Sequence, residues 1–194
     1  MKKFLFMAIL MMATTSVFAQ REPGSLTFQP RVGLIAADFN NTGDTEARVG
    51  VFAGGDFEYY VNSVVGLSAG VFYAQQGAEL KDYNVTWKLD YLNIPIMANI
   101  YIFKGLALKA GLQPGFKVSS TLEGTWKGGS ASINIEDTVN DFDVAVPLGI
   151  SVDLGRLVLD ARYTLGLKQI FKDDMDLDSK NITFQLGIGY KFSL

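Results

Sequence analysis

The chain of 194 residues contains neither cysteine nor histidine. Without cysteine it forms no disulfide and offers no thiol for a lipid anchor or for covalent catalysis. Without histidine it lacks the side chain that most often serves as a general base, as the activator of a nucleophile or as a zinc ligand. We therefore predict a protein that is not an enzyme and that holds no cofactor and no metal.

Long apolar runs are also scarce, and the clearest one lies at the start of the chain. Lys2 and Lys3 precede the apolar residues 4–12, and small residues then lead to Ala19. This order is typical of a secretory signal peptide, so we predict a signal peptide over residues 1–19 and an exported domain over residues 20–194. A membrane anchor is the alternative, but the run is shorter than the roughly 20 residues that a spanning helix needs.

Basic residues are outnumbered by acidic ones. Removing Lys2 and Lys3 from the 17 basic residues leaves 15 against 20 acidic residues, a net charge of −5. A protein that binds nucleic acid needs a basic face, so we predict no nucleic-acid partner. Charges and glycines also interrupt every later apolar segment, so any membrane span would have to consist of strands.

The last stretch of the chain, residues 181–194, alternates between two kinds of side chain. Its even positions, from Ile182 to Leu194, are apolar, and its odd positions, which include Gln185 and Lys191, are polar or glycine. A period of two over this length predicts a β-strand, because successive side chains leave a strand on opposite sides.

The same alternation recurs in seven earlier segments. Long polar connections (residues 38–47, 77–86, 119–141 and 168–180) alternate with turns of two or three residues. An even strand number with long loops at one end and tight turns at the other is the pattern of an outer-membrane barrel. We predict an all-β, eight-stranded antiparallel up-and-down transmembrane β-barrel, closed by pairing of the first and last strands, in the outer membrane of a Gram-negative bacterium. The predicted strands are residues 26–36, 48–60, 64–76, 87–103, 106–118, 142–154, 157–167 and 181–194.

The apolar face of these strands is predicted to contact lipid. It carries large, branched and aromatic side chains and no charge, whereas the other face is small and polar. Eight strands enclose a lumen only just wide enough for side chains, so inward aromatic residues would crowd it. A Lys or Arg on the lipid face costs ~2–4 kcal/mol at the bilayer midplane, which fixes the register. A soluble β-sandwich is the alternative.

Two local features depart from this pattern. Trp87, Leu89 and Tyr91 run in the opposite phase to the rest of their strand, which indicates a bulge or an extension beyond the membrane. Four prolines also fall inside predicted strands, where they cannot donate to the hydrogen-bond ladder, so we expect a local bulge at each. These prolines are Pro30, Pro95, Pro114 and Pro147.

Three segments in the middle of the chain carry a family resemblance. They are Gly-Val-Phe-Tyr-Ala-Gln-Gln-Gly at 70–77, Tyr-Leu-Asn-Ile-Pro-Ile at 91–96 and Gly-Leu-Ala-Leu-Lys-Ala-Gly-Leu-Gln-Pro-Gly-Phe at 105–116. Together they resemble the PorT-like outer-membrane β-barrel proteins of the Bacteroidetes type, often labelled porin-family proteins. The resemblance implies an eight-stranded outer-membrane barrel and little about activity, although PorT itself is associated with a secretion system. The ending Tyr190-Lys191-Phe192-Ser193-Leu194 lacks the usual terminal aromatic residue but keeps the alternation.

Ten charged residues fall at inward positions, five of each sign. Buried charges must be paired and hydrogen-bonded, so we predict a structural network of ion pairs that fills the lumen. A narrow selective path is the alternative, and a catalytic carboxylate pair at Asp56 and Glu58 is a more distant one. The ten residues are Arg31, Asp56, Glu58, Lys109, Lys117, Asp143, Asp153, Asp160, Arg162 and Lys191.

The loops contain two further candidates. Asp174, Asp176 and Asp178 stand at alternate positions, as in some calcium loops, but the glycine and the distant glutamate of an EF-hand are missing. We predict a solvated acidic loop there, with cation binding as the alternative. Trp126 is either an exposed contact for a partner or glycan or a residue that packs on the barrel rim.

These patterns predict a non-enzymatic integral outer-membrane protein with a side-chain-filled polar lumen. Its exterior loops, chiefly residues 119–141, offer a surface for an extracellular protein partner, and a periplasmic partner is a further option. The alternatives are a narrow porin-like channel for small solutes and an accessory component of a secretion system. The other predicted partners are outer-membrane lipid and the barrel-assembly machinery, which we expect to recognise the last strand at Tyr190, Phe192 and Leu194.

Overall fold

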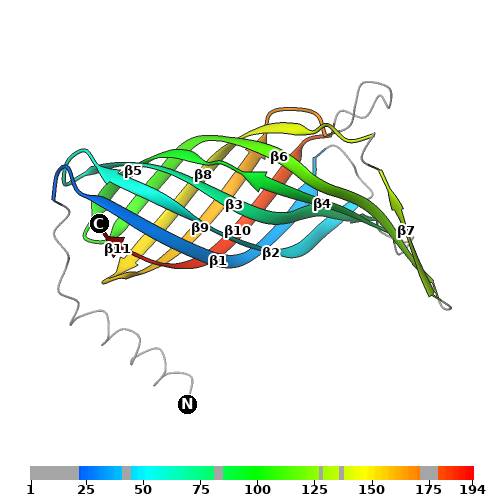
Figure 1. Cartoon of the computed structure of the whole chain (residues 1–194), viewed down its shortest axis with the longest axis horizontal. Helices are drawn as coiled ribbons and strands as arrows, with labels where there is room; N and C mark the ends of the chain where they lie inside the picture. The colour runs from blue at the N-terminus through cyan, green and yellow to red at the C-terminus, as the bar shows by residue number, and fades with distance from the viewer. Residues whose placement is uncertain (1–21, 41–44, 81–84, 127–128, 136–137, 171–178) are drawn as a thin grey trace, which may run out of the picture.

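The computed structural model describes residues 22–40, 45–80, 85–126, 129–135, 138–170 and 179–194. Within these ranges the strands form one antiparallel sheet that closes into a barrel (Figure 1). The predicted signal peptide and the acidic loop at Asp174, Asp176 and Asp178 lie outside the described residues. No described helix is long and apolar enough to cross a membrane. The strands are β1 (Leu26–Phe39), β2 (Thr45–Tyr60), β3 (Val65–Leu80), β4 (Val85–Asn93), β5 (Ile96–Phe103), β6 (Leu106–Trp126), β7 (Gly129–Asn134), β8 (Phe142–Leu154), β9 (Leu157–Gly166), β10 (Asn181–Tyr190) and β11 (Phe192–Ser193).

Eight antiparallel strands form the ring in the described part of the chain, as the sequence predicts. β5 continues the line of β4, β11 continues that of β10, and β7 pairs only with β6. The first and last strands close the barrel, with β1 and β10 paired from Arg31↔Gly189 to Phe39↔Asn181. The up-and-down order confirms the predicted fold class.

The two ends of the barrel differ, as Figure 1 shows. The carboxyl terminus and β11 lie at one end, which we call the turn end because short turns join the strands there, such as the turn between Phe103 and Leu106. β7 lies at the opposite end, which we call the loop end. The outer surface between them is apolar: on β10, Phe184 and Leu186 are about half exposed while Gln185 is buried.

The prediction of a loop over residues 119–141 is wrong for most of this segment, because the segment contains a β-hairpin. β6 continues to Trp126 and pairs with β7 from Thr121↔Asn134 to Trp126↔Gly129. We call residues 121–126 and 129–134 the arm, and Figure 1 shows it projecting beyond the loop end. All six residues of β7 are exposed, and a strand exposed on both faces needs no apolar side, so the alternation that reveals a strand is missing from its sequence. The predicted loop 77–86 is also shorter, because β3 reaches Leu80 and β4 starts at Val85.

The bulges expected at the prolines are absent. Phe72↔Asn93 and Ala69↔Ile96 lie in one register on either side of Pro95, and β1 keeps one register with β10 and β11 across Pro30. Pro114 and Pro147 likewise pair within single registers. Each proline removes one donor without needing an inserted residue, so the ladder tolerates a local gap.

Register shifts occur elsewhere in the sheet. One lies in β2 between Ala47 and Phe52. Another lies between Asp90 and Tyr91 of β4, where Val118 of β6 is the extra residue. The bulge expected within the strand of Trp87, Leu89 and Tyr91 is absent, because odd positions from Leu89 through Asn93 to Met97 stay inward and the extra residue lies on β6.

Candidate functional site in the barrel lumen

The inward side chains include two clusters of charged residues, an apolar cap, and a further apolar cluster of Ile35, Phe52, Phe72 and Ala74. Near the turn end lies the Lys191 cluster, in the middle lies the Asp160 cluster, and near the loop end lies an apolar cap. The inward position of each strand residue in these groups follows from the period of two along its strand, since the intervening residues are the exposed apolar ones.

The Asp160 cluster joins residues of four strands, and we define it as Arg31, Asp56, Lys109, Asp160 and Arg162. Asp160 of β9 accepts from Arg31 of β1 at 2.9 Å and from Lys109 of β6 at 3.0 Å. Arg31 also donates to Asp56 of β2 at 2.6 Å. Arg162 stands further off, with its Nη2 atom 3.5 Å from Asp160. All five side chains are at most 7% exposed, so these charges lie in the interior and hold distant strands together.

Two neighbouring residues of β3, Gly70 and Phe72, allow the buried side chains of Asp56 and Arg31 to be accommodated in the lumen. Gly70 of β3 lies opposite Asp56, and a Cβ atom at Gly70 would come within 2.5 Å of the Asp56 Cβ. The guanidinium carbon of Arg31 lies 4.8 Å from the centre of the Phe72 ring, which adds a cation–π contact. A glycine and an aromatic face therefore supply the room and the support that a buried carboxylate–guanidinium pair requires.

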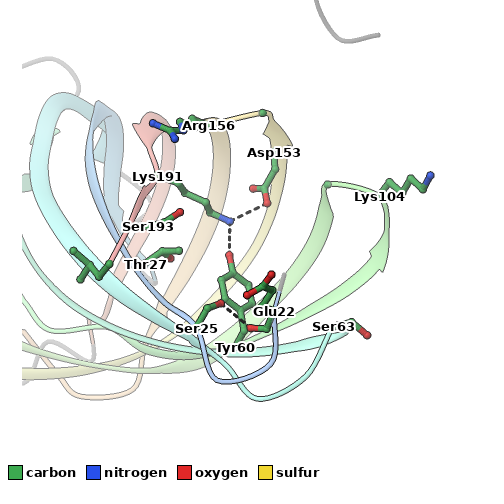
Figure 2. Close-up of a pocket in the computed structure, with 13 residues that line it drawn as sticks. Glu22, Ser25, Thr27, Tyr60, Ser63, Lys104, Asp153, Arg156, Lys191 and Ser193 are labelled. Carbon is green, nitrogen blue, oxygen red and sulfur yellow. Dashed lines mark hydrogen bonds and ion pairs between the residues drawn. The ribbon is translucent and has the colours of Figure 1, made fainter. Parts of the chain in front are cut away.

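The Lys191 cluster consists of Lys191, Glu58, Asp153, Tyr60 and Tyr101. The ammonium group of Lys191 lies 2.8 Å from Asp153 and 3.4 Å from Glu58, and it donates to both tyrosine hydroxyls. Tyr101 donates to Glu58 at 2.7 Å. Figure 2 shows Lys191 pointing between Asp153 and Tyr60. The cluster thus crosses the lumen near the turn end.

A cavity of about 1010 Å³ lies at the turn end, where Tyr60, Asp153 and Lys191 form part of its lining (Figure 2). Its lining also includes Lys104 and Arg156 of the turns. Because residues of the Lys191 cluster line it, the cavity is a vestibule that ends at this cluster.

The apolar cap consists of Phe39, Ala78, Leu89, Tyr91, Val139 and Ile170, and each of them is at most 5% exposed. Four of these side chains come from strands, whereas Val139 and Ile170 come from the connections that follow β7 and β9. Leu89 and Tyr91 lie on the same inward face as Asn93 and Met97, so the apparent change of phase reflects apolar side chains inside the barrel at this end. Trp87 packs against the same group.

Hydrogen bonds hold the two cap connections in place. The backbone N–H of Asn140 donates to Ile170 at 2.8 Å, and the Asn140 side chain donates to Gln169 at 3.0 Å. Lys117 donates to the carbonyl of Val139 at 2.8 Å and pairs with Asp141 at 2.8 Å. These contacts fix Val139 and Ile170 over the loop end of the lumen.

The ten charged residues predicted for the lumen do not form one network. Eight of them belong to the Asp160 or the Lys191 cluster. Lys117 instead holds the cap, and Asp143 accepts from the backbone N–H of Val144. Four residues of these groups were not among the predicted site residues: Tyr60, Tyr101, Val139 and Ile170. Tyr60 and Tyr101 lie at inward strand positions that alternation marks, whereas Val139 and Ile170 lie outside the strands.

The arrangement offers little for catalysis. Asp56 and Glu58, the predicted carboxylate pair, belong to different clusters, and each has a cationic partner. Among the residues that the structure describes, no group of three or more acidic side chains is placed to hold a metal ion. The lumen therefore has the chemistry of a structural brace with paired charges.

Comparison with known proteins agrees with the fold. A family model described as outer membrane protein beta-barrel domain matches residues 18–172. Ail, the attachment invasion locus protein of Yersinia pestis, is 17% identical over 88% of this chain and 99% of that chain, with a TM-score of 0.53. The neisserial surface protein NspA is 12% identical over 86% of this chain and 97% of that chain, with a TM-score of 0.54. No curated protein sequence matches the chain.

The structural similarities, at these low identities, concern the fold alone, whereas the family match covers most of the chain. The protein is located in the outer membrane of a Gram-negative bacterium, so its turn end faces the periplasm and its loop end the exterior. The chain belongs to the outer membrane protein beta-barrel domain family.

Proposed function

We propose that the protein is a non-enzymatic outer-membrane anchor that presents its arm to an extracellular protein partner. The observation that carries this proposal is the exposed edge of β7. In the described part of the chain β7 pairs with β6 alone, and all six of its residues are exposed. An open strand edge is a template for an added strand from another chain.

The chemistry of β7 favours strand addition. Its sequence, Gly-Ser-Ala-Ser-Ile-Asn, contains no charge and no proline, which are the usual protections of an edge. The N–H of Ile135 donates to Ser120, and antiparallel hydrogen bonding alternates, so Ile133 and Ala131 also face β6. The N–H groups of Ser132 and Ser130 therefore point away from β6, toward an incoming strand.

The closed lumen supports an anchor rather than a conduit. A solute entering from the periplasm would meet the Lys191 cluster, then the Asp160 cluster and then the apolar cap. Eight strands leave an interior that side chains fill. A narrow channel for small solutes is the second candidate, favoured by the charged residues Asp153, Arg156 and Lys191 in the lining of the turn-end cavity.

Partner binding by the arm can be tested with substitutions in β7 that leave its hydrogen bonds to β6 intact. Ser132→Pro removes an outward N–H, and Ser132→Ala keeps it. With a photo-reactive residue at position 133, whole cells exposed to the surrounding proteins should give a cross-linked product for S132A that is lost for S132P. Equal cross-linking by both variants, or none by either, would overturn partner binding at this edge.

Conductance separates the two candidates. In planar bilayers the folded protein should show no steady single-channel openings. Openings whose size changes when Asp160 or Arg162 is neutralised would support the channel and contradict the closed anchor.

Finer assignments belong to the same proposal. The segments at 70–77, 91–96 and 105–116 support a PorT-like affiliation of the Bacteroidetes type, and with it an accessory role in secretion. We also propose that residues 1–19 are a cleaved signal peptide, because a barrel of the outer membrane has to be exported. Recognition of Tyr190, Phe192 and Leu194 by the assembly machinery is supported by the exposure of Phe192 and Leu194 at the turn end.

A further inference from the structure

The outer edge of β7 presents the same hydrogen-bonding groups at two serines. The N–H of Ile135 donates to Ser120, and from there every second residue of β7 turns its backbone groups toward β6. Both the N–H and the C=O of Ser130 and of Ser132 therefore point away from β6. All six residues of β7 are exposed, so another strand can reach this edge.

This edge is complementary to itself. When a second β7 is laid antiparallel with Ala131 opposite Ala131, Ser130 lies opposite Ser132 of the second copy, and Ser132 lies opposite its Ser130. Each of these two pairs exchanges two backbone hydrogen bonds, because the residues of a hydrogen-bonded antiparallel pair donate to and accept from each other. A second copy of β7 therefore supplies every partner that the two serines need.

The side chains agree with this pairing. In the same register Ile133, which is 62% exposed, lies opposite Gly129 of the second copy, where no side chain obstructs it. Ser130 and Ser132 lie on the other face of the joined sheet, where opposed hydroxyl groups form hydrogen bonds across strands. β7 carries no charge, so two copies meet without like charges opposite each other.

The pairing also keeps the two barrels apart. Gly129 pairs with Trp126 at the far end of the arm, and Thr121 pairs with Asn134 at the end nearer the barrel. Because antiparallel strands run in opposite directions, the second barrel lies beyond the far end of the first arm. Figure 1 shows the arm projecting beyond the loop end, which faces the exterior. This arrangement suits two barrels in facing membranes.

We infer that the arm pairs with the arm of a second copy of this chain in a facing outer membrane, by antiparallel addition of β7 to β7. The inference rests on the proposed function, because it names the partner that the exposed edge takes. The contact involves residues 129–133 of each copy and is much smaller than a stable interface of ~1,600 Å², so one pair is weak and transient. Many copies in facing membranes bind together, and their combined affinity far exceeds that of one pair.

Clustering of lipid vesicles tests the inference. Vesicles that carry the folded protein at high density should cluster, as followed by light scattering, and vesicles without protein should stay dispersed. Ser132→Pro removes an outward N–H and should abolish clustering, whereas Ser132→Ala should keep it. Clustering that survives in S132P, or dispersed vesicles with the unaltered protein, would overturn the inference.

Charge at position 131 tests the register. Ala131→Asp and Ala131→Lys each place like charges opposite each other at the centre of the pair, so vesicles with either variant alone should cluster less than those with the unaltered protein. A mixture of A131D and A131K vesicles should cluster more than either alone, because opposite charges then meet. Heat-modifiable gel migration checks that each variant is folded. A mixture that clusters no better than its components would contradict the pairing of β7 with β7.

The photo-reactive residue at position 133 separates this inference from the proposed function. In whole cells it should give a product with twice the mass of the chain, lost in S132P. A product that joins the chain to a different protein, with none of twice the mass, would overturn self-pairing and leave partner binding at this edge intact. The absence of any product would overturn both.

Discussion

The two halves of the lumen hold the barrel together in different ways. Toward the turn end the inward side chains are charged, and ion pairs join strands as far apart as β1, β6 and β9 at Asp160. Toward the loop end an apolar cap fills the lumen among polar side chains such as Gln76 and Asn181, and residues of two connecting segments, Val139 and Ile170, complete the cap. The outer face is apolar along both halves. Contact with lipid therefore requires apolar side chains on the outward face of every strand, whereas the inward side chains change in character from the turn end to the loop end.

The difference has a physical reason in what each half must bring together. Ion pairs are directional, so three cations around one carboxylate fix the distances between distant strands. Apolar packing is non-directional and excludes water, which suits the closing of an end by connecting segments. The polar half thus specifies the ring, and the apolar half seals it.

The largest effect is expected for Asp160→Asn. The change leaves Arg31, Lys109 and Arg162 with one remaining carboxylate, Asp56, in the interior. Removing one partner of a buried ion pair costs about 3–5 kcal/mol, because an uncompensated charge stays behind. Urea unfolding of the protein in lipid vesicles, followed by gel migration, should show this loss in the free energy of unfolding.

Asp141→Asn is the matched control for this change. Asp141 also pairs with a buried lysine, Lys117, but its own side chain is 80% exposed. An exposed carboxylate is already solvated, so its loss should cost much less than the loss of Asp160. If both variants lost the same free energy of unfolding, burial of the carboxylate would not determine how much an ion pair of the lumen stabilises the barrel.

The second effect, of about 3 kcal/mol, is expected for Leu89→Ala in the apolar cap. Leu89 is 0% exposed, and removing a buried leucine side chain costs roughly 2–5 kcal/mol through lost transfer energy and the cavity left behind. The same unfolding measurement applies. Leu92→Ala, three residues along the same strand on the lipid side, should cost less, since Leu92 is 37% exposed. If the two substitutions reduced the free energy of unfolding equally, the apolar cap would not be a packed core.

The sequence predicted the features that lipid imposes. Residues such as Leu186 and Ile188 must face outward on every second position, so the strands, their register and the pairing of the first and last strands could be predicted from alternation. The inward placement of Arg31, Asp160 and Arg162 followed from the same rule. Their division into two clusters did not, because alternation assigns a side of the sheet and says nothing about partners across the lumen.

Three features could not be predicted for identifiable reasons. Val139 and Ile170 lie outside regular strands, where no periodicity marks a buried position. β7 of the arm is exposed on both faces, so Ser130 and Ser132 resemble a loop in the sequence. The bulges expected at prolines such as Pro95 are absent because a missing donor leaves a gap without changing the register.

The smallest effect is expected for Glu123→Gln in the arm, which makes the same carboxylate-to-amide change as Asp160→Asn. Glu123 of β6 pairs with Lys88 of β4, and the two side chains are 30% and 41% exposed. Exposed pairs contribute about 0–1 kcal/mol, because water solvates both charges and salt screens them. The cost should vanish near 1 M salt, where the Debye length is ~3 Å, whereas the cost of Asp160→Asn should persist. A salt-resistant loss for Glu123→Gln, measured by the same urea unfolding, would mean that the arm is held to the barrel as firmly as the lumen strands are held to one another.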